Sequence, residues 1–203
     1  MFGHSPSQLL LKRWKIILFV GGIFAVLVLG LSAVFPLDYR ADAQILIIPR
    51  ASYGVDSYTA IKSAERIGDN IAQVVKTGNF YDKVTALPQY AGQIDWSRFQ
   101  NVSDRVVRKR WQKTVDASVV YGTGVLNIST YHRRPDQAKL LASAVTDALV
   151  AYGYEYVGGE VTIKVVNLPI ATLLPARPNL VLNFLAGFVF GALLMGTVVV
   201  RKK

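Results

Sequence analysis

Two uncharged apolar segments, one near each end of the 203-residue chain, constrain its fold more than any other feature. Residues 16–35 have the sequence IILFVGGIFAVLVLGLSAVF, and residues 180–200 have the sequence LVLNFLAGFVFGALLMGTVVV. An α-helix rises about 1.5 Å per residue, so each segment would be about 30 Å long, which matches the hydrocarbon core of a bilayer. We therefore expect two transmembrane helices.

Cations flank both segments. Three of the four residues 12–15 are Lys or Arg, and so are all of residues 201–203. Because Lys and Arg in short loops favour the cytoplasmic side, we expect both termini in the cytoplasm. The expected organisation is a cytoplasmic segment 1–15, transmembrane helices 16–35 and 180–200, an extracytoplasmic domain 36–179 and a cytoplasmic tail 201–203.

Each segment has an alternative interpretation. The first could be a cleaved signal peptide, since Ala41-Asp42-Ala43 resembles a cleavage site. However, the apolar core of a signal peptide spans about 7–15 residues, and this segment is longer. The second could be a buried core helix, which its length and the three cations that follow it disfavour. Two membrane spans are therefore the preferred interpretation.

The charge balance looks at first like that of a nucleic-acid-binding protein. The formal net charge is +10, from 23 Lys and Arg against 13 Asp and Glu. Six of these cations flank the membrane segments, and residues 37–179 hold 17 cations against 13 acids, a modest excess. The basic residues of this domain also lie on the side away from nucleic acid, so we expect no nucleic-acid partner.

The residues between the membrane segments predict an α+β domain, a small mixed sheet packed by helices on one face. Alternating or continuous apolar patterns predict strands and amphipathic patterns predict helices. The expected strands are 39–49, 114–120, 125–131 and 161–167, with 114–131 forming a hairpin. The expected helices are 56–76, 80–87, 103–113 and one beginning at Pro135. A stiff extended strap, residues 168–178, with Pro169, Pro175 and Pro178, then leads to the second membrane segment.

The sequence offers little catalytic chemistry. It has no cysteine and two histidines, His4 and His132, so it has few residues that could bind a metal. It contains no G-x-S-x-G, Walker A or H-E-x-x-H motif, and its acids are scattered. We therefore expect no enzymatic activity, no catalytic residue, no metal and no cofactor.

Two groups of residues are candidate contact sites. The cations at 105–110 could contact an anionic partner such as an anionic glycan or lipid phosphate, or another subunit; a solvated helix face is the simpler alternative. This group consists of Arg105, Arg108, Lys109 and Arg110. In the second membrane segment, small residues permit close helix packing, and a polar residue one turn inside the membrane would need a partner. These candidates for helix packing or oligomer contacts are Gly187, Gly191, Gly196 and Asn183.

Several motifs occur in an order that resembles a known family. Residues 39–47 (YRADAQILI) resemble its first strand, and residues 135–142 (PDQAKLLA) resemble the start of its conserved helix. Residues 165–169 (VVNLP), followed by further prolines, Asn183 and the two glycines, resemble its strap and second membrane helix. The family is that of the Wzz-type polysaccharide chain-length determinants, also called polysaccharide co-polymerases. Pro135 and Asp136 stand in reversed order from the family's usual pair, and residues 77–113 leave no room for a long coiled extension.

The resemblance implies a non-enzymatic homo-oligomer in the bacterial cytoplasmic (inner) membrane. Such a scaffold would contact membrane lipid and a polysaccharide polymerase, flippase or exporter. It would regulate the chain length, polymerisation or export of O-antigen, capsule or exopolysaccharide. An alternative is a membrane adaptor or sensor that recruits a cytoplasmic kinase or transporter component of such a pathway.

Overall fold

The computed structural model describes residues 10–49, 56–157 and 161–201, which fall into two compact units. One unit contains helices α2 (Trp14–Val34) and α7 (Leu180–Arg201), and the other is the domain Asp38–Leu174. Helix α2 begins two residues before the expected span, and α7 ends one residue after it. Both helices are long and apolar enough to cross a membrane, and in the most apolar window of each only 17% is buried. That low burial argues against a buried core helix.

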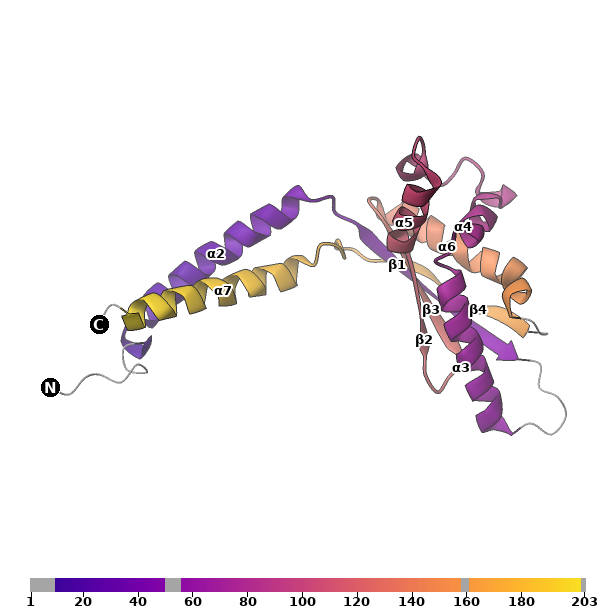
Figure 1. Cartoon of the computed structure of the whole chain (residues 1–203), viewed down its shortest axis with the longest axis horizontal. Helices are drawn as coiled ribbons and strands as arrows, with labels where there is room; N and C mark the ends of the chain where they lie inside the picture. The colour runs from indigo at the N-terminus through magenta and orange to yellow at the C-terminus, as the bar shows by residue number, and fades with distance from the viewer. Residues whose placement is uncertain (1–9, 50–55, 158–160, 202–203) are drawn as a thin grey trace. The chain divides into compact units, whose positions relative to one another are not determined.

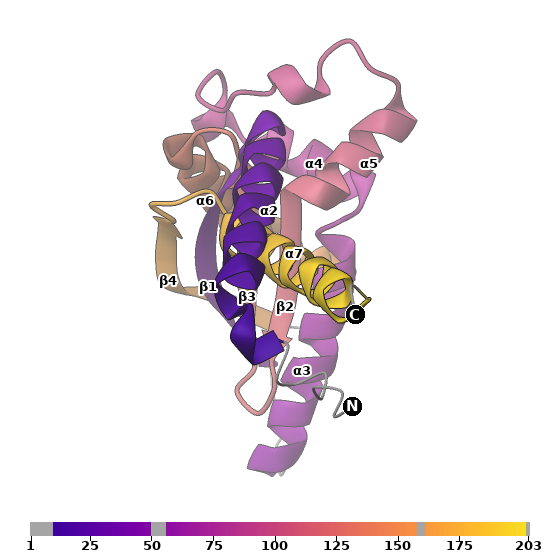
Figure 2. The same ribbon diagram turned by 90° about the vertical axis from the view of Figure 1, so that its left-hand side faces the viewer.

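The domain contains a four-stranded sheet in the order β2-β3-β1-β4, as Figure 2 shows. The strands are β1 (Tyr39–Pro49), β2 (Val115–Val120), β3 (Val125–His132) and β4 (Val161–Ala171). All three strand pairs are antiparallel, so the expectation of a mixed sheet is wrong. The predicted hairpin is confirmed as β2–β3, where Gly122 and Gly124 adopt positive φ angles of 82° and 69° in the turn.

Helices pack against one face of this sheet (Figures 1 and 2). They are α3 (Ser57–Val74), α4 (Gly78–Thr85), α5 (Asp104–Thr114) and α6 (Pro135–Tyr152). Alternate residues of β1 and β3, such as Ile45 and Ile128, point into a core that also contains Ile71 of α3 and Leu141 of α6. The α+β class is therefore confirmed.

The predicted helix starts agree with the structure where local capping chemistry was clear. Asp56 caps α3, and its carboxylate accepts a hydrogen bond from the Thr59 N–H over 2.8 Å. Pro135 occupies the first turn of α6, where its missing N–H leaves no helical bond unmade. Helix α4 begins at Gly78, two residues before the expected start at residue 80, because the Thr77 hydroxyl accepts from the Phe80 N–H and caps it.

Strand β4 is longer than expected and takes in the first residues of the predicted strap. It continues through Pro169 to Ala171, where the expected strand stops at Asn167. Its pairing with β1 shifts register twice, between Asp42 and Ile45. Proline cannot donate to a ladder and is confined to edge strands or bulges, and here β4 satisfies both conditions.

Candidate functional site

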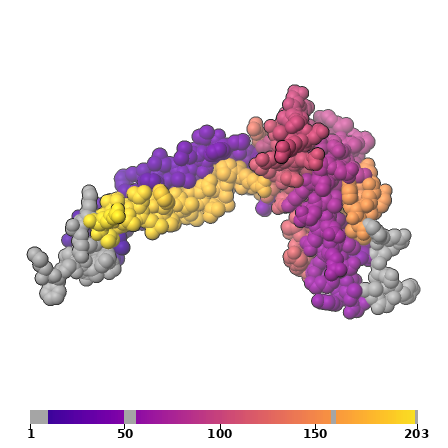
Figure 3. Space-filling view, in the orientation of Figure 1, coloured from indigo at the N-terminus to yellow at the C-terminus, as the bar shows by residue number. Residues whose placement is uncertain are grey.

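Helices α2 and α7 lie side by side (Figure 3) and pack against each other as an antiparallel hairpin. Glycines of both helices lie at the contact. A Cβ placed on Gly191 would lie 2.7 Å from Cβ of Phe24, and one on Gly187 would lie 2.9 Å from Cβ of Val28. Real Cβ atoms essentially never approach that closely, so only glycine permits this helix separation. The predicted small-residue face therefore contacts a helix of the same chain.

The other two residues of this segment that were predicted to make helix-packing or oligomer contacts, Asn183 and Gly196, lie in different surroundings. Asn183 has a partner, because its Nδ2 donates to Oγ of Ser32 over 2.8 Å. Gly196 lies outside the close contact, since a Cβ there would be 3.6 Å from Leu10. Gly196 instead lines an apolar groove of about 750 Å³ between the two helices, together with Ile17 and Ala192.

Sequence reasoning missed the residues of α2 that complete this interface. Ser32 is 7% exposed, and its hydroxyl donates to the Val28 carbonyl over 2.8 Å while it accepts from Asn183. Gly21 faces Phe188, where a Cβ would come within 3.1 Å of the ring. One signal was present: Ser32 is a polar residue near the end of the first apolar segment, as Asn183 is near the start of the second.

The four candidate cations of α5 are all exposed, but their surroundings differ. Arg108 lines a cavity of about 580 Å³ between α4 and α5, whereas Nη1 of Arg110 donates to the Arg98 carbonyl. Arg105, Arg108 and Lys109 are three and four residues apart, so they lie on one side of α5. Arg110 is held by its bond within the domain.

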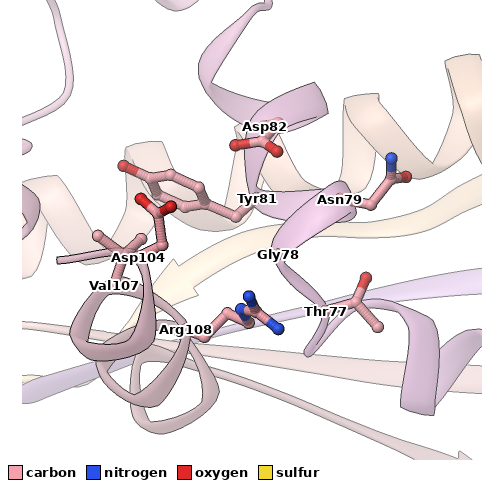
Figure 4. A pocket seen from close by; sticks show the side chains of 8 residues that line it. All are labelled: Thr77, Gly78, Asn79, Tyr81, Asp82, Asp104, Val107 and Arg108. Atoms are coloured by element: carbon pink, nitrogen blue, oxygen red, sulfur yellow. The ribbon is translucent and has the colours of Figure 1, made fainter.

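The cavity between α4 and α5 has mixed charge. Figure 4 shows Arg108 extending from α5 toward the start of α4, and the Asp104 carboxylate beside the Tyr81 ring. Its wall carries one guanidinium against two carboxylates, those of Asp82 and Asp104. This charge does not favour an anion inside the cavity, so an anionic partner would have to bind at the exposed surface of Arg105, Arg108 and Lys109.

The sheet face opposite the helices carries polar rows that run across the strands. Ser118, Asn127, Gln44 and Asn167 are aligned across all four strands. Gln44 Nε2 donates to Asn127 Oδ1 over 2.7 Å, and Asn167 Nδ2 donates to Gln44 Oε1. These residues border a hollow of about 760 Å³. Such a face can offer hydrogen bonds, and the polar alternation is also typical of a solvated sheet face.

A charged cluster surrounds His132 at the end of β3. Nε2 of His132 lies 4.0 Å from a carboxylate oxygen of Asp95, and Nδ1 accepts the Arg134 N–H over 3.2 Å. Burial and the nearby Arg98 guanidinium lower the pKa of His132 from its ordinary 6.5, although Asp95 acts in the opposite direction. His132 is therefore held in its neutral form near pH 7.

The described part of the chain contains no group of three or more His, Cys, Asp or Glu residues that could hold a metal ion. The three strap prolines are divided between elements: Pro169 lies in β4, and Pro175 and Pro178 precede α7.

A scan against protein-family models and a search of curated proteins both find no match to this chain. The resemblance to Wzz-type proteins therefore rests on the order of the motifs.

Proposed function

We propose that this chain is a non-enzymatic membrane scaffold in which α2 and α7 cross the bacterial cytoplasmic membrane as a hairpin. The observation that carries the proposal is the contact between two apolar helices from opposite ends of the chain, with Asn183 bonded to Ser32. A polar pair at a helix contact is favourable in lipid, where neither group could bond to water. The hairpin is thus suited to hold one folded domain at a membrane.

The flanking cations support the orientation. Lys12, Arg13 and Lys15 lie at the start of α2, and the cations of residues 201–203 lie at the end of α7 and beyond it. The positive-inside rule therefore favours both termini in the cytoplasm and the domain outside. A reporter enzyme inserted at the exposed hairpin turn near Tyr121 tests this orientation. We expect activity for a reporter that functions only outside the cytoplasm. Activity of a reporter that functions only inside would contradict the proposal.

The order of the motifs supports the pathway assignment. We propose that the scaffold is a homo-oligomer that regulates the chain length, polymerisation or export of a surface polysaccharide, in contact with a polymerase, flippase or exporter. Regulation of length by a scaffold requires no catalytic group. It requires several copies of the chain, anchored in the membrane in a constant arrangement. The proposed hairpin would supply the anchor.

Gene deletion in the native host, followed by electrophoresis of the surface glycan, tests the function. We expect a changed length distribution that wild-type protein restores. Gly191→Leu, which forces the helices apart, should restore it poorly. Gly22→Leu is the matched control, because nothing lies within 4 Å of a Cβ at that position. An unchanged glycan after deletion would contradict a role in chain length.

A further inference from the structure

The last residues of the domain expose a dense group of aliphatic side chains. Residues 168–174 have the sequence LPIATLL, and we call them the leucine segment. Leu168 is 76% exposed, Ile170 73%, Leu173 95% and Leu174 76%. Isolated exposed apolar residues are ordinary, but four large ones within seven residues form a patch that commonly marks an interaction surface.

The leucine segment is held in place by the start of β1. The Thr172 N–H donates to the Arg40 carbonyl over 2.7 Å, and the Arg40 N–H donates to Thr172 Oγ1 over 3.1 Å. Leu168 and Ile170 lie in β4 and Thr172 is bonded to β1, so the leucine segment is anchored to the sheet as far as Thr172.

Short connections join this point to both apolar helices. Leu174 is six residues before Leu180, where α7 begins, and Arg40 is six residues after Val34, where α2 ends. Six residues span at most about 20 Å when fully extended. A membrane crossed by these helices therefore lies within the reach of a short tether from the leucine segment.

The charge of this part of the chain suits a lipid surface. Residues 161–203 contain no Asp or Glu, and the cations Lys164 and Arg177 flank the leucine segment. Aliphatic side chains with nearby Lys or Arg are the combination that lies at the boundary between headgroups and acyl chains, where the cations meet lipid phosphates. Acidic residues near the leucine segment would repel lipid phosphates, whereas they would not prevent the binding of a protein partner. The absence of Asp and Glu therefore favours lipid.

We propose that the leucine segment docks the domain onto the headgroup region of the membrane, with Leu173 and Leu174 entering the acyl boundary. This inference rests on the proposed function, because it requires α2 and α7 to cross that membrane. Docking would restrict the tilt of the domain above the bilayer. The domains of neighbouring copies would then lie at the same distance from the membrane.

The absence of cysteine permits a direct test on the full chain. Leu173→Cys, Tyr121→Cys and Val26→Cys each carry one environment-sensitive fluorophore in vesicles of phosphatidylcholine and phosphatidylglycerol. Spin-labelled lipids then quench fluorophores at headgroup depth or at acyl-chain depth. Tyr121, which is 71% exposed in the β2–β3 turn, is the control for water, and Val26 in α2 is the control for the membrane span. Leu173 is nearly fully exposed, so its replacement removes little packing.

We expect the headgroup quencher to reduce the fluorescence of the label at position 173 several-fold more than that of the label at position 121. The quencher at acyl-chain depth should reduce the fluorescence of the label at position 26. Equal, weak quenching at positions 173 and 121, with Val26 quenched, would overturn the docking inference and leave the proposed membrane anchor intact. An unquenched Val26 label would overturn the membrane anchor itself. A Leu173 label that is shielded but unquenched, together with disulfide-linked dimers of Leu173→Cys, would assign the segment to a second copy and overturn lipid docking.

Discussion

The Asn183 side chain of α7 donates a hydrogen bond to the Ser32 hydroxyl of α2 over 2.8 Å, although 151 residues separate them. The Ser32 hydroxyl in turn donates a hydrogen bond to the Val28 carbonyl, also over 2.8 Å. Each polar group in this apolar contact therefore has a partner. The bond lies near the end of α2 and the start of α7, which are the ends of the two helices that connect to the domain.

A double-mutant cycle with Asn183→Ala and Ser32→Ala should measure this bond. We expect a coupling free energy of about 0.6 kcal/mol, and at most about 1.7 kcal/mol, the average and the maximum of double-mutant cycles between transmembrane helices. Unfolding of the purified chain in mixed micelles provides the measurement. Additive single effects, with no coupling, would show that the bond does not stabilise the hairpin.

Substitution of Gly191 should separate the helices. The side chain of Gly191→Leu would overlap Phe24, whereas Gly22→Leu meets no neighbouring atom within 4 Å. With cysteines at positions 32 and 183, the rate of disulfide formation in bilayers reports helix pairing. We expect Gly191→Leu to slow it several-fold and Gly22→Leu to leave it unchanged. Similar rates in both variants would contradict the glycine contact.

Trp111 should be a major stabilising residue of the domain. It is fully buried, its Nε1 donates to the Val75 carbonyl over 2.8 Å, and its ring meets Tyr81 and Phe99 edge-on. We expect Trp111→Ala to destabilise the domain by about 3–5 kcal/mol. Trp111→Phe, which keeps a ring but leaves the carbonyl without its donor, should cost about 1–3 kcal/mol.

Urea unfolding of the full chain in detergent, followed by near-ultraviolet circular dichroism, measures both effects. The control is Tyr121→Phe at an exposed position, where the expected change is within about 0.5 kcal/mol. Equal stability of Trp111→Phe and wild type would show that the indole hydrogen bond contributes nothing.

His132 should make the stability of the domain depend on pH. Its pKa in the folded domain lies below the ordinary 6.5, so the unfolded chain binds the proton more readily. The stabilisation from neutral His132 is therefore fully present above about pH 6.5 and declines as the pH falls below it. His132→Gln should flatten the difference in unfolding free energy between pH 7 and pH 5. An unchanged pH profile in that variant would assign the dependence to other groups.

Features that depend on neighbouring residues were predictable from the sequence. The apolar segments, their flanking cations, the β2–β3 hairpin and the start of α6 at Pro135 all follow from local length, periodicity or capping. Asn183 also stood out, because a polar side chain in an apolar segment needs a partner. The identity of that partner did not follow, since helix pairing brings together residues from opposite ends of the chain.

Tertiary structure alone decided the rest. Pro169 would end an isolated strand, but pairing of β4 with β1 across more than 110 residues, through two shifts of register, keeps it within the sheet. The same pairing is antiparallel, places β4 at the edge of the sheet and leaves Leu168 and Ile170 exposed. Local patterns specify which face of an element is apolar, but the element that covers this face is selected by packing across the whole chain.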